Sequence, residues 1–436
     1  MSDLQRAFAK AKLSGLPPVV PQTLNDLPED EDEEEGDLDS FGELKTERSD
    51  DDSSSASSAS STGTIRPSSA RRTFARPNRY GTSFRWSCNV IADLCRPASR
   101  SSSHSPLSWT SYFERDIIIP HKTADSDISH HAYLTSPIFA PGRLGPLFIT
   151  HHGAGSSGLS FALLAKALKE QLPDAGILSV DARGHGSTTV TPTSSASHDA
   201  PFDMSLESLT SDLLHVIQYT KEQMKWPSMP PLILVGHSLG GSVVTAAAAR
   251  GTLGPALLAY AVLDIVENTA IEALSSMDGY LKRRPATFPS LEAAIDWHLR
   301  SHLIRNAESA RISVPPLLSL AHNGTPSQKY SWRTDLAATS PFWPDWFTHL
   351  SSRFLKSRGG KLLLLAGTER LDTEMMIGQM QGKYALQIFP EAGHFLHEDC
   401  PEKTAQALVE LYRRNDRAGL VLPMKVDEMI KMGKKI

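Results

Sequence analysis

The chain has 436 residues, enough for one large domain or two medium ones, and its 40 % hydrophobic and 21 % charged residues are ordinary for a globular protein. Much of the net charge of −5 lies in one acidic run at 29–39, and the rest is close to neutral, which gives no case for a nucleic-acid binder. Three irregularly spaced cysteines argue against a disulfide framework, and no apolar run is long enough to span a membrane. We therefore expect an intracellular protein, in the cytoplasm or also in the nucleus.

Composition changes sharply near residue 105. Residues 1–105 are acidic, then serine-rich, then arginine-rich, and they hold too little apolar surface to offset the entropy cost of ordering. We expect a disordered tail there, interrupted by an apolar island at 86–95 that fits neither a tail nor a folded domain. A folded domain is expected over 106–420, and a short basic tail over 421–436.

From about residue 106 the chain alternates short branched apolar runs with helical segments. Three of the runs, at 147–150, 232–235 and 362–365, are apolar on both faces, which is typical of strands that helices cover on both sides. The alternation predicts an α/β fold with a mostly parallel sheet. The predicted strands lie at 115–120, 145–153, 176–186, 231–238, 258–266, 361–367 and 384–390, and the predicted helices at 158–171, 205–224, 240–250 and 401–414.

The interval 267–355 breaks this alternation. It contains an amphipathic segment at 290–303 and a tryptophan-rich segment at 331–347. Because it lies between two predicted strands, an insertion of this kind is expected to cover the C-terminal edge of the sheet as a helical lid.

A glycine-flanked serine marks the end of the strand at 231–238. The residues Gly236-His237-Ser238-Leu239-Gly240 match the G-x-S-x-G pattern, in which small neighbours let the chain turn sharply and leave the serine hydroxyl exposed. The pattern alone is weak, but an apolar strand precedes it and a run of small helix-forming residues follows. This context favours a nucleophile over a structural turn.

A second glycine-rich turn, at 149–155, follows an earlier strand. A serine that attacks a carbonyl carbon creates an oxyanion that needs two preorganised donors. We expect these donors to be the backbone N–H groups of Ala154 and Leu239. The paired histidines at 151–152 lack acidic or histidine partners at ligand spacing, so we expect no metal site there.

The serine also needs a base, and histidine is the usual one. His394 follows the last predicted strand, which is the place that the chain order Ser, Asp, His gives it. Two acids fit this order, because Asp264 ends the strand after the serine and Asp372 follows the strand after the insertion. The position in the fold favours Asp372, but the residues alone do not decide between them.

The chain resembles the protein phosphatase methylesterases from about residue 105 to 414. The similarity is carried by GHSLGGSVV, by VLDIVENTAIEALSSM at 262–277, by RRPATFPSLEAAIDWHL at 283–299, and by IGQMQGKYALQIFPEAGHFLHEDCPEK at 377–403. Several of these blocks lie outside the general hydrolase signature, so the match is specific to this family. The resemblance implies an α/β-hydrolase fold.

The resemblance also implies the roles of the site residues. Ser238 would be the nucleophile, His394 the general base and Asp264 the acid, which leaves Asp372 as the alternative acid. The family usually has H-G-G-G in the glycine turn, whereas this chain has His-Gly-Ala-Gly at 152–155. Alanine keeps its N–H, so an oxyanion donor is retained. This chemistry requires no metal and no organic cofactor.

The implied substrate is the methyl ester on the C-terminal leucine of the type 2A protein phosphatase catalytic subunit, with no nucleic-acid or membrane partner. Two alternatives are a lipase-like small-molecule carboxylesterase and a phosphatase-binding module with an incidental triad. The basic segment at 281–285 would suit an acidic or phosphorylated tail, or would be a solvated face. Trp332, Trp343 and Trp346 would line a partner surface or form a lid core.

Overall fold

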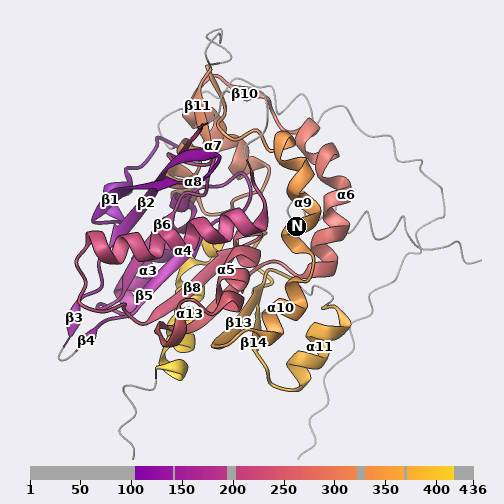
Figure 1. Ribbon diagram of the computed structural model, residues 1–436. Coiled ribbons are helices and arrows are strands. Elements are labelled where there is room, and N and C mark those ends of the chain that lie inside the picture. Colours follow the sequence, from indigo (N-terminus) through magenta and orange to yellow (C-terminus); the bar gives the residue numbers. More distant parts are fainter. Residues whose placement is uncertain (1–103, 141–142, 194–202, 322–328, 368–370, 417–436) are drawn as a thin grey trace, which may run out of the picture. The chain divides into compact units, whose positions relative to one another are not determined.

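The computed structural model describes residues 104–140, 143–193, 203–321, 329–367 and 371–416 (Figure 1). The predicted disordered tail up to residue 103, with its apolar island at 86–95, and the predicted basic tail at 421–436 lie outside the described residues. Within the described part, no helix combines the length and the apolar character that crossing a membrane requires.

A nine-stranded sheet forms the centre of the fold. Its strands run in the order β1, β2, β6, β5, β8, β9, β13, β14, and β7 pairs with β2. The six strands from β6 to β14 are parallel, whereas β1, β2 and β7 pair antiparallel. The bounds are β1 Arg115–Lys122, β2 Ser126–Thr135, β5 Leu147–His151, β6 Gly176–Val180, β7 Thr189–Pro192, β8 Leu232–His237, β9 Leu257–Leu263, β13 Gly360–Leu365 and β14 Ala385–Ile388.

All seven predicted strands belong to this sheet, and the four predicted helices are present. Strands β2 and β7 of this sheet were not predicted from the sequence. Strand β2 carries polar residues on its buried side, where the His131 Nδ1 atom lies 2.9 Å from the Asp181 carboxylate. Because buried polar residues such as His131 interrupt the apolar residues of β2, its sequence lacks the continuous apolar run that predicts a buried strand.

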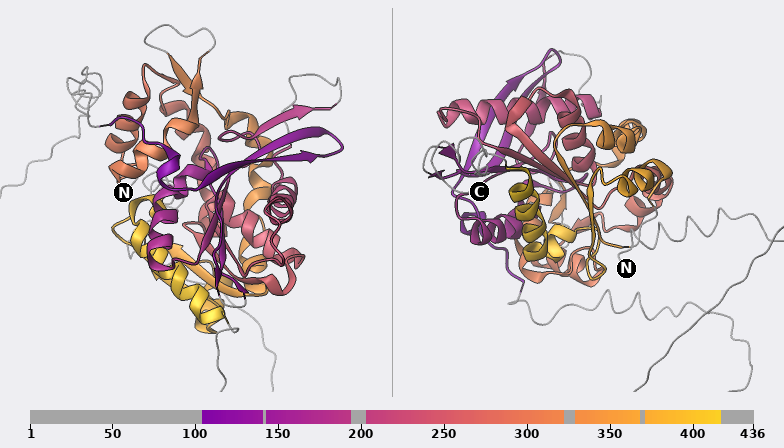
Figure 2. Two further views of the ribbon diagram at one scale, coloured as in Figure 1. Left: turned by 90° about the vertical axis from the view of Figure 1, so that its left-hand side faces the viewer. Right: turned by 90° about the horizontal axis from the view of Figure 1, so that it is seen from below.

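Helices cover both faces of the sheet (Figure 2). One face packs against α3 (Ala162–Gln171) and α13 (Pro401–Asn415). The other packs mainly against α4 (Leu206–Gln223) and α5 (Leu239–Arg250), with α10 (Leu350–Lys356) and α11 (Thr373–Met380) beside them.

The pleat of the strands explains this arrangement. In β8, Leu232 and Leu234 belong to the core on the α5 side, whereas Ile233 and Val235 belong to the core on the α3 side. Successive side chains of a strand point to opposite faces, so a continuous apolar run provides a core on both. The parallel strands then end at one common edge, where polar residues of separate loops meet.

The segment between the neighbouring strands β9 and β13 is the long insertion that the sequence indicates. It holds α6 (Glu267–Arg283), a small sheet in the order β10, β12, β11, and further short helices. Trp343 and Trp346 are buried, and the Trp346 Nε1 atom donates to the Met204 carbonyl at 2.8 Å. These two tryptophans are therefore core residues rather than a partner surface.

The remaining elements are short. They are β3 Phe139–Ala140, β4 Arg143–Leu144, β10 Thr287–Phe288, α7 Leu291–Arg300, α8 Ala307–Ser313, β11 Leu318–Leu320, β12 Tyr330–Trp332, α9 Trp343–Phe347 and α12 Leu396–Asp399, with 3₁₀ turns at Trp109–Ser111, Gly158–Phe161, Gly254–Ala256, Pro315–Leu317 and Ala337–Phe342.

Candidate active site

Ser238 occupies a sharp turn between β8 and α5. Its backbone has φ 52° and ψ −119°, a conformation that residues other than glycine rarely adopt. The turn needs glycines on both sides, because a Cβ at Gly236 would lie 2.1 Å from the Gly240 carbonyl oxygen, and one at Gly240 would lie 2.0 Å from the His151 carbonyl oxygen. The strand and helix thus meet in a strained elbow that leaves Ser238 partly exposed in a cavity.

The structure brings His394 and Asp264 together from two other strand ends. The His394 Nδ1 atom lies 2.7 Å from Asp264 Oδ2, and Asp264 Oδ1 accepts a hydrogen bond of 2.7 Å from the Ala366 N–H. Because the carboxylate accepts from Nδ1, the Nε2 atom of His394 is the one available for proton transfer. His394 and Ser238 line the same cavity.

Asp372 does not contact His394 but lies at the N-terminus of α11. Its side chain caps the N-terminus of α11, where Oδ1 accepts from the Met375 N–H at 2.8 Å. Its other oxygen accepts from the Ser351 hydroxyl on α10. The geometry therefore pairs Asp264 with the histidine and gives Asp372 a helix-capping contact.

The glycine-rich turn packs directly against the elbow. A Cβ at Gly153 would lie 3.0 Å from the Ser238 Cβ, and Ala154 lines the cavity. The Gly155 N–H donates to His185 Nε2 at 2.9 Å, which fixes the turn from the neighbouring loop. Leu239 is the first residue of α5, where backbone N–H groups have no acceptor within the helix.

The paired histidines are structural. The His152 Nδ1–H donates to the Gly153 carbonyl at 2.8 Å, and its Nε2 accepts from the Ala182 N–H at 3.0 Å, so neither nitrogen is open to a metal. His151 is buried, and this burial lowers its pKa to about 4. Both rings are neutral supports for the turn.

A different trio has the spacing of metal ligands. Atoms of His121, His130 and Asp212 all lie within 4.8 Å of one another, the one such group among the described residues. The Asp212 carboxylate, however, already accepts two hydrogen bonds from Arg183, at 2.6 and 2.7 Å. Burial raises the pKa of Asp212, but the hydrogen bonds from the two histidines and Arg183 outweigh it and hold that pKa well below its usual range. We interpret the trio as a charge-compensated network that joins β1 and β2 to α4.

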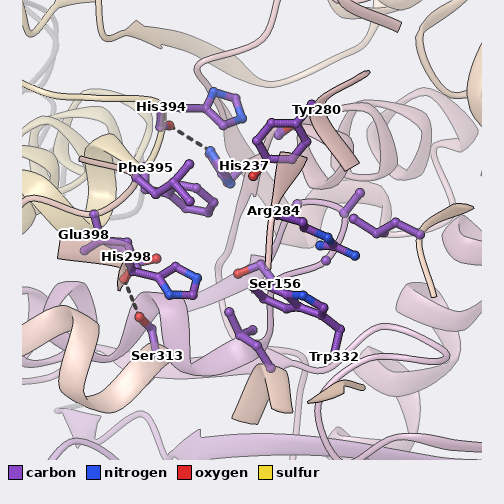
Figure 3. Close-up of a pocket in the computed structure, with 18 of the residues that line it drawn as sticks. Ser156, His237, Tyr280, Arg284, His298, Ser313, Trp332, His394, Phe395 and Glu398 are labelled. Atoms are coloured by element: carbon purple, nitrogen blue, oxygen red, sulfur yellow. Dashed lines mark hydrogen bonds between the residues drawn. The ribbon is translucent and has the colours of Figure 1, made fainter. Parts of the chain in front are cut away.

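The cavity that Ser238 lines has a volume of about 120 Å³. Figure 3 shows residues that line it, among them Arg284, Trp332 and Glu398. The insertion supplies more than half of its lining residues, and many of the side chains are apolar. Its apolar and aromatic lining consists of Ala154, Met277, Tyr280, Leu303, Ile304, Leu317, Trp332, Leu336 and Phe395.

The sequence did not indicate four titratable residues of this cavity: His237, Tyr280, His298 and Glu398. Arg284 also lines it, and it belongs to the basic segment at 281–285 that the sequence offered for an acidic or phosphorylated tail or as a solvated face. Glu398 is buried, accepts hydrogen bonds from the hydroxyls of Ser313 (2.6 Å) and Ser309 (2.8 Å), and has its pKa raised by burial to about 8. Glu398 lies close to His394 in the sequence, but the two serines that donate to it lie 85 and 89 residues away in the chain. Only the fold brings them together.

Two contacts hold the loop that carries His394. The His237 Nε2–H donates to the His394 carbonyl at 2.9 Å, as Figure 3 shows. The Asp399 carboxylate accepts from the Gly393 N–H at 2.7 Å and from the Arg305 N–H at 2.7 Å. Burial holds the pKa of His237 well below its ordinary value, so this ring stays neutral beside the catalytic candidates.

The fold and this site define a serine hydrolase of the α/β class. Residues 147–407 match the Alpha/beta hydrolase family. A solved structure of E-2-(acetamidomethylene)succinate hydrolase shares the fold, with 19 % identity, a TM-score of 0.51, and coverage of 68 % of this chain and 100 % of that one.

Curated relatives narrow the class. The chain is 53 % identical over 438 residues to protein phosphatase methylesterase 1 of Gibberella zeae and 51 % identical over 481 residues to that of Neurospora crassa, with both chains of each pair fully covered. That of Schizosaccharomyces pombe is 42 % identical over 75 % of this chain and 90 % of its own length. The chain belongs to the α/β-hydrolase family and, within it, to the protein phosphatase methylesterases, which makes it a carboxylic ester hydrolase.

Proposed function

We propose that the chain removes the methyl ester from the C-terminal leucine of the catalytic subunit of a type 2A protein phosphatase. The observation that carries the proposal is the 2.7 Å contact between His394 and Asp264 at the cavity that Ser238 also lines. The relatives' name supports a methylated phosphatase as the substrate.

In the proposed mechanism Ser238 is the nucleophile, His394 the general base and Asp264 the acid that orients the histidine. His394 Nε2 takes the proton of the Ser238 hydroxyl as the serine oxygen bonds to the ester carbonyl carbon. The backbone N–H groups of Ala154 and Leu239 stabilise the oxyanion that forms.

The tetrahedral intermediate then collapses to an acyl-enzyme. The bond from the carbonyl carbon to the methoxy oxygen breaks, and His394 gives its proton to that oxygen, which leaves as methanol. Water attacks the acyl-enzyme while His394 accepts one of its protons, and that proton returns to the serine oxygen as the C–O bond to serine breaks. The product leaves as the carboxylic acid, which gives its remaining proton to solvent and becomes the carboxylate.

The cavity supports an apolar C-terminal residue. Aliphatic side chains from the insertion, such as Leu303, Ile304 and Leu317, line it. Burying a leucine side chain among them stabilises binding by about 1.5–3 kcal/mol. An ester carries no charge, so it enters such a site at lower cost than the free carboxylate does.

The test is demethylation of an intact methylated phosphatase by the wild type and by Ser238→Ala. We expect the variant to lose at least about 10⁴-fold in kcat. Ser242→Ala is the matched control, because the buried Ser242 hydroxyl has no hydrogen-bond partner in the described part of the chain and its loss should leave the rate unchanged.

The outcomes separate the alternatives. Wild-type activity in Ser238→Ala would contradict the assigned nucleophile. Hydrolysis of short acyl esters without demethylation of the phosphatase would instead indicate a small-molecule carboxylesterase. Failure of Ser238 to react with a fluorophosphonate probe would indicate a binding module with an incidental triad.

A further inference from the structure

Arg284 brings a positive charge to the wall of the cavity. It directly follows α6, and its guanidinium lies 4.4 Å from the centre of the Trp332 ring (Figure 3). Such stacking suits an arginine that leaves its N–H groups free for a planar anion. Burial lowers the pKa of Arg284, which indicates that water solvates this cation poorly.

Among the described residues, no carboxylate forms an ion pair with Arg284, and Asp335 acts on it only at longer range, by raising its pKa. Within the described residues, the guanidinium forms no ion pair with a carboxylate within 4.0 Å and no hydrogen bond. Asp335 is the nearby carboxylate, and its Oδ1 atom accepts from the N–H groups of Ala337 (3.0 Å) and Ala338 (3.3 Å). A half-buried arginine without a counterion is costly unless a ligand supplies one.

Two other titratable groups of the cavity, Glu398 and His298, do not supply the missing charge. Glu398, whose pKa burial raises to about 8, is mostly uncharged at neutral pH. His298 has its pKa lowered to about 4, first by burial and also by the charge of Arg284, and its Nδ1–H donates to the Ala294 carbonyl at 2.8 Å. Arg284 therefore sets the sign of the charge on this side of the cavity.

Local contacts hold the arginine in place. The Trp332 Nε1–H donates to the Pro285 carbonyl at 2.7 Å, which ties β12 to the residue that follows Arg284. The Trp332 ring also packs edge-on against Phe288 and His298. The ring and the guanidinium are thus preorganised, so little ordering entropy opposes the binding of an anion.

We propose that Arg284 binds an anionic group of the substrate peptide, a side-chain carboxylate or a phosphate, a few residues before the esterified C-terminal residue. This inference rests on the proposed function, because it places the ester at Ser238. The ester itself is neutral, so the counterion of Arg284 has to come from the preceding residues. Arg284 would then determine specificity among peptide methyl esters.

The test uses synthetic peptide methyl esters and the full chain. Each peptide ends in leucine methyl ester and carries Asp, Asn, phosphoserine or Ser at one of the four preceding positions. At the responsive position we expect the wild type to prefer Asp over Asn, or phosphoserine over Ser, by about tenfold or more in kcat/KM. Comparing the two pairs distinguishes a carboxylate site from a phosphate site.

In Arg284→Gln, the ratio of kcat/KM between the charged and the neutral peptide should fall close to one. Arg283→Gln is the matched control, because Arg283 is the exposed neighbour in the chain and its loss removes the same charge without touching the cavity. The control should keep the preference. An equal preference in wild type and Arg284→Gln, or an equal loss in both variants, would overturn the inference.

Failure of the proposed function gives a different result. If the wild type hydrolyses p-nitrophenyl acetate but none of the peptide esters, the peptide methylesterase assignment is wrong. If it hydrolyses the peptide esters without regard to their charge, only the role of Arg284 is wrong.

Discussion

Asp264 combines two unusual properties at one residue. Its backbone has φ 52°, outside the range that non-glycine residues favour, and both carboxylate oxygens have defined partners. The Ala366 N–H fixes one oxygen, so the other is held toward His394. Asp372 also has both oxygens engaged, but by a helix end and a serine.

Substituting these two acids separates their roles. Asp264→Asn should lower kcat by about 10⁴-fold, because the amide cannot stabilise the imidazolium or hold the correct tautomer. Asp372→Asn should change kcat by less than about tenfold, since asparagine is as good a helix cap as aspartate. Ester hydrolysis under saturating substrate measures both. A larger loss in Asp372→Asn would make Asp372 the acid.

At the scale of the elements, the junction of β8 and α5 determines where Ser238, the proposed nucleophile, lies. Helix α5 approaches the end of β5 so closely that Gly240 contacts the backbone of His151. This close approach brings the glycine-rich turn beside the elbow. The arrangement of the site thus depends on the absence of side chains at the start of α5.

Gly240→Ala should disrupt this junction. The new Cβ would lie 2.0 Å from the His151 carbonyl oxygen, and backbone cannot move aside cheaply, so we expect a loss of at least about 3 kcal/mol in the free energy of unfolding. Gly251→Ala, just after the same helix, meets no atom within 4 Å and suffers only from its φ of 68°, at about 1–2 kcal/mol. Urea unfolding of both variants measures the difference, and equal losses would contradict the packing argument.

The elements also show what the sequence could predict. Apolar runs and the glycine pattern identify β8, α5 and the place of Ser238, because these depend on local composition. The pairing of His394 with Asp264 rather than Asp372 depends on which loop reaches the histidine, and both acids follow strands. Glu398 was not predicted for the same reason, since its importance comes from residues far away in the chain. The basic segment at 281–285 was identified, but the sequence does not show that Arg284 is the residue of it that reaches the cavity.

At the scale of the whole molecule, the interior is rich in neutral histidines. Burial lowers the pKa of His151 and His298 to about 4 and of His397 to about 3, and it lowers the pKa of three more. These three are His152, His185 and His237. All six stay unprotonated in the folded state at pH values where the unfolded chain binds protons.

The protein should therefore lose stability steeply as the pH falls from about 6.5 toward 4, by up to about 1.4 kcal/mol per pH unit for each histidine. Glu398, Asp399 and His131 act in the opposite sense, because their pKa values are raised in the folded state and their stabilisation is lost as the pH rises, but they are three groups against six. Urea unfolding between pH 4.5 and 8 measures the slope. His397→Leu should reduce the slope of the unfolding free energy with pH by the contribution of one histidine. A free energy of unfolding that is independent of pH below about 6.5 would contradict the argument.

The strained backbone of Ser238 has a consequence for protein engineering. Positive φ values at Ser238 and Asp264 each cost on the order of 1–3 kcal/mol, and glycine would relieve both. A search for more thermostable variants that scored folding alone would choose glycine at these two positions. The resulting protein would have a higher free energy of unfolding, but it would lack the hydroxyl and the carboxylate on which the proposed chemistry depends.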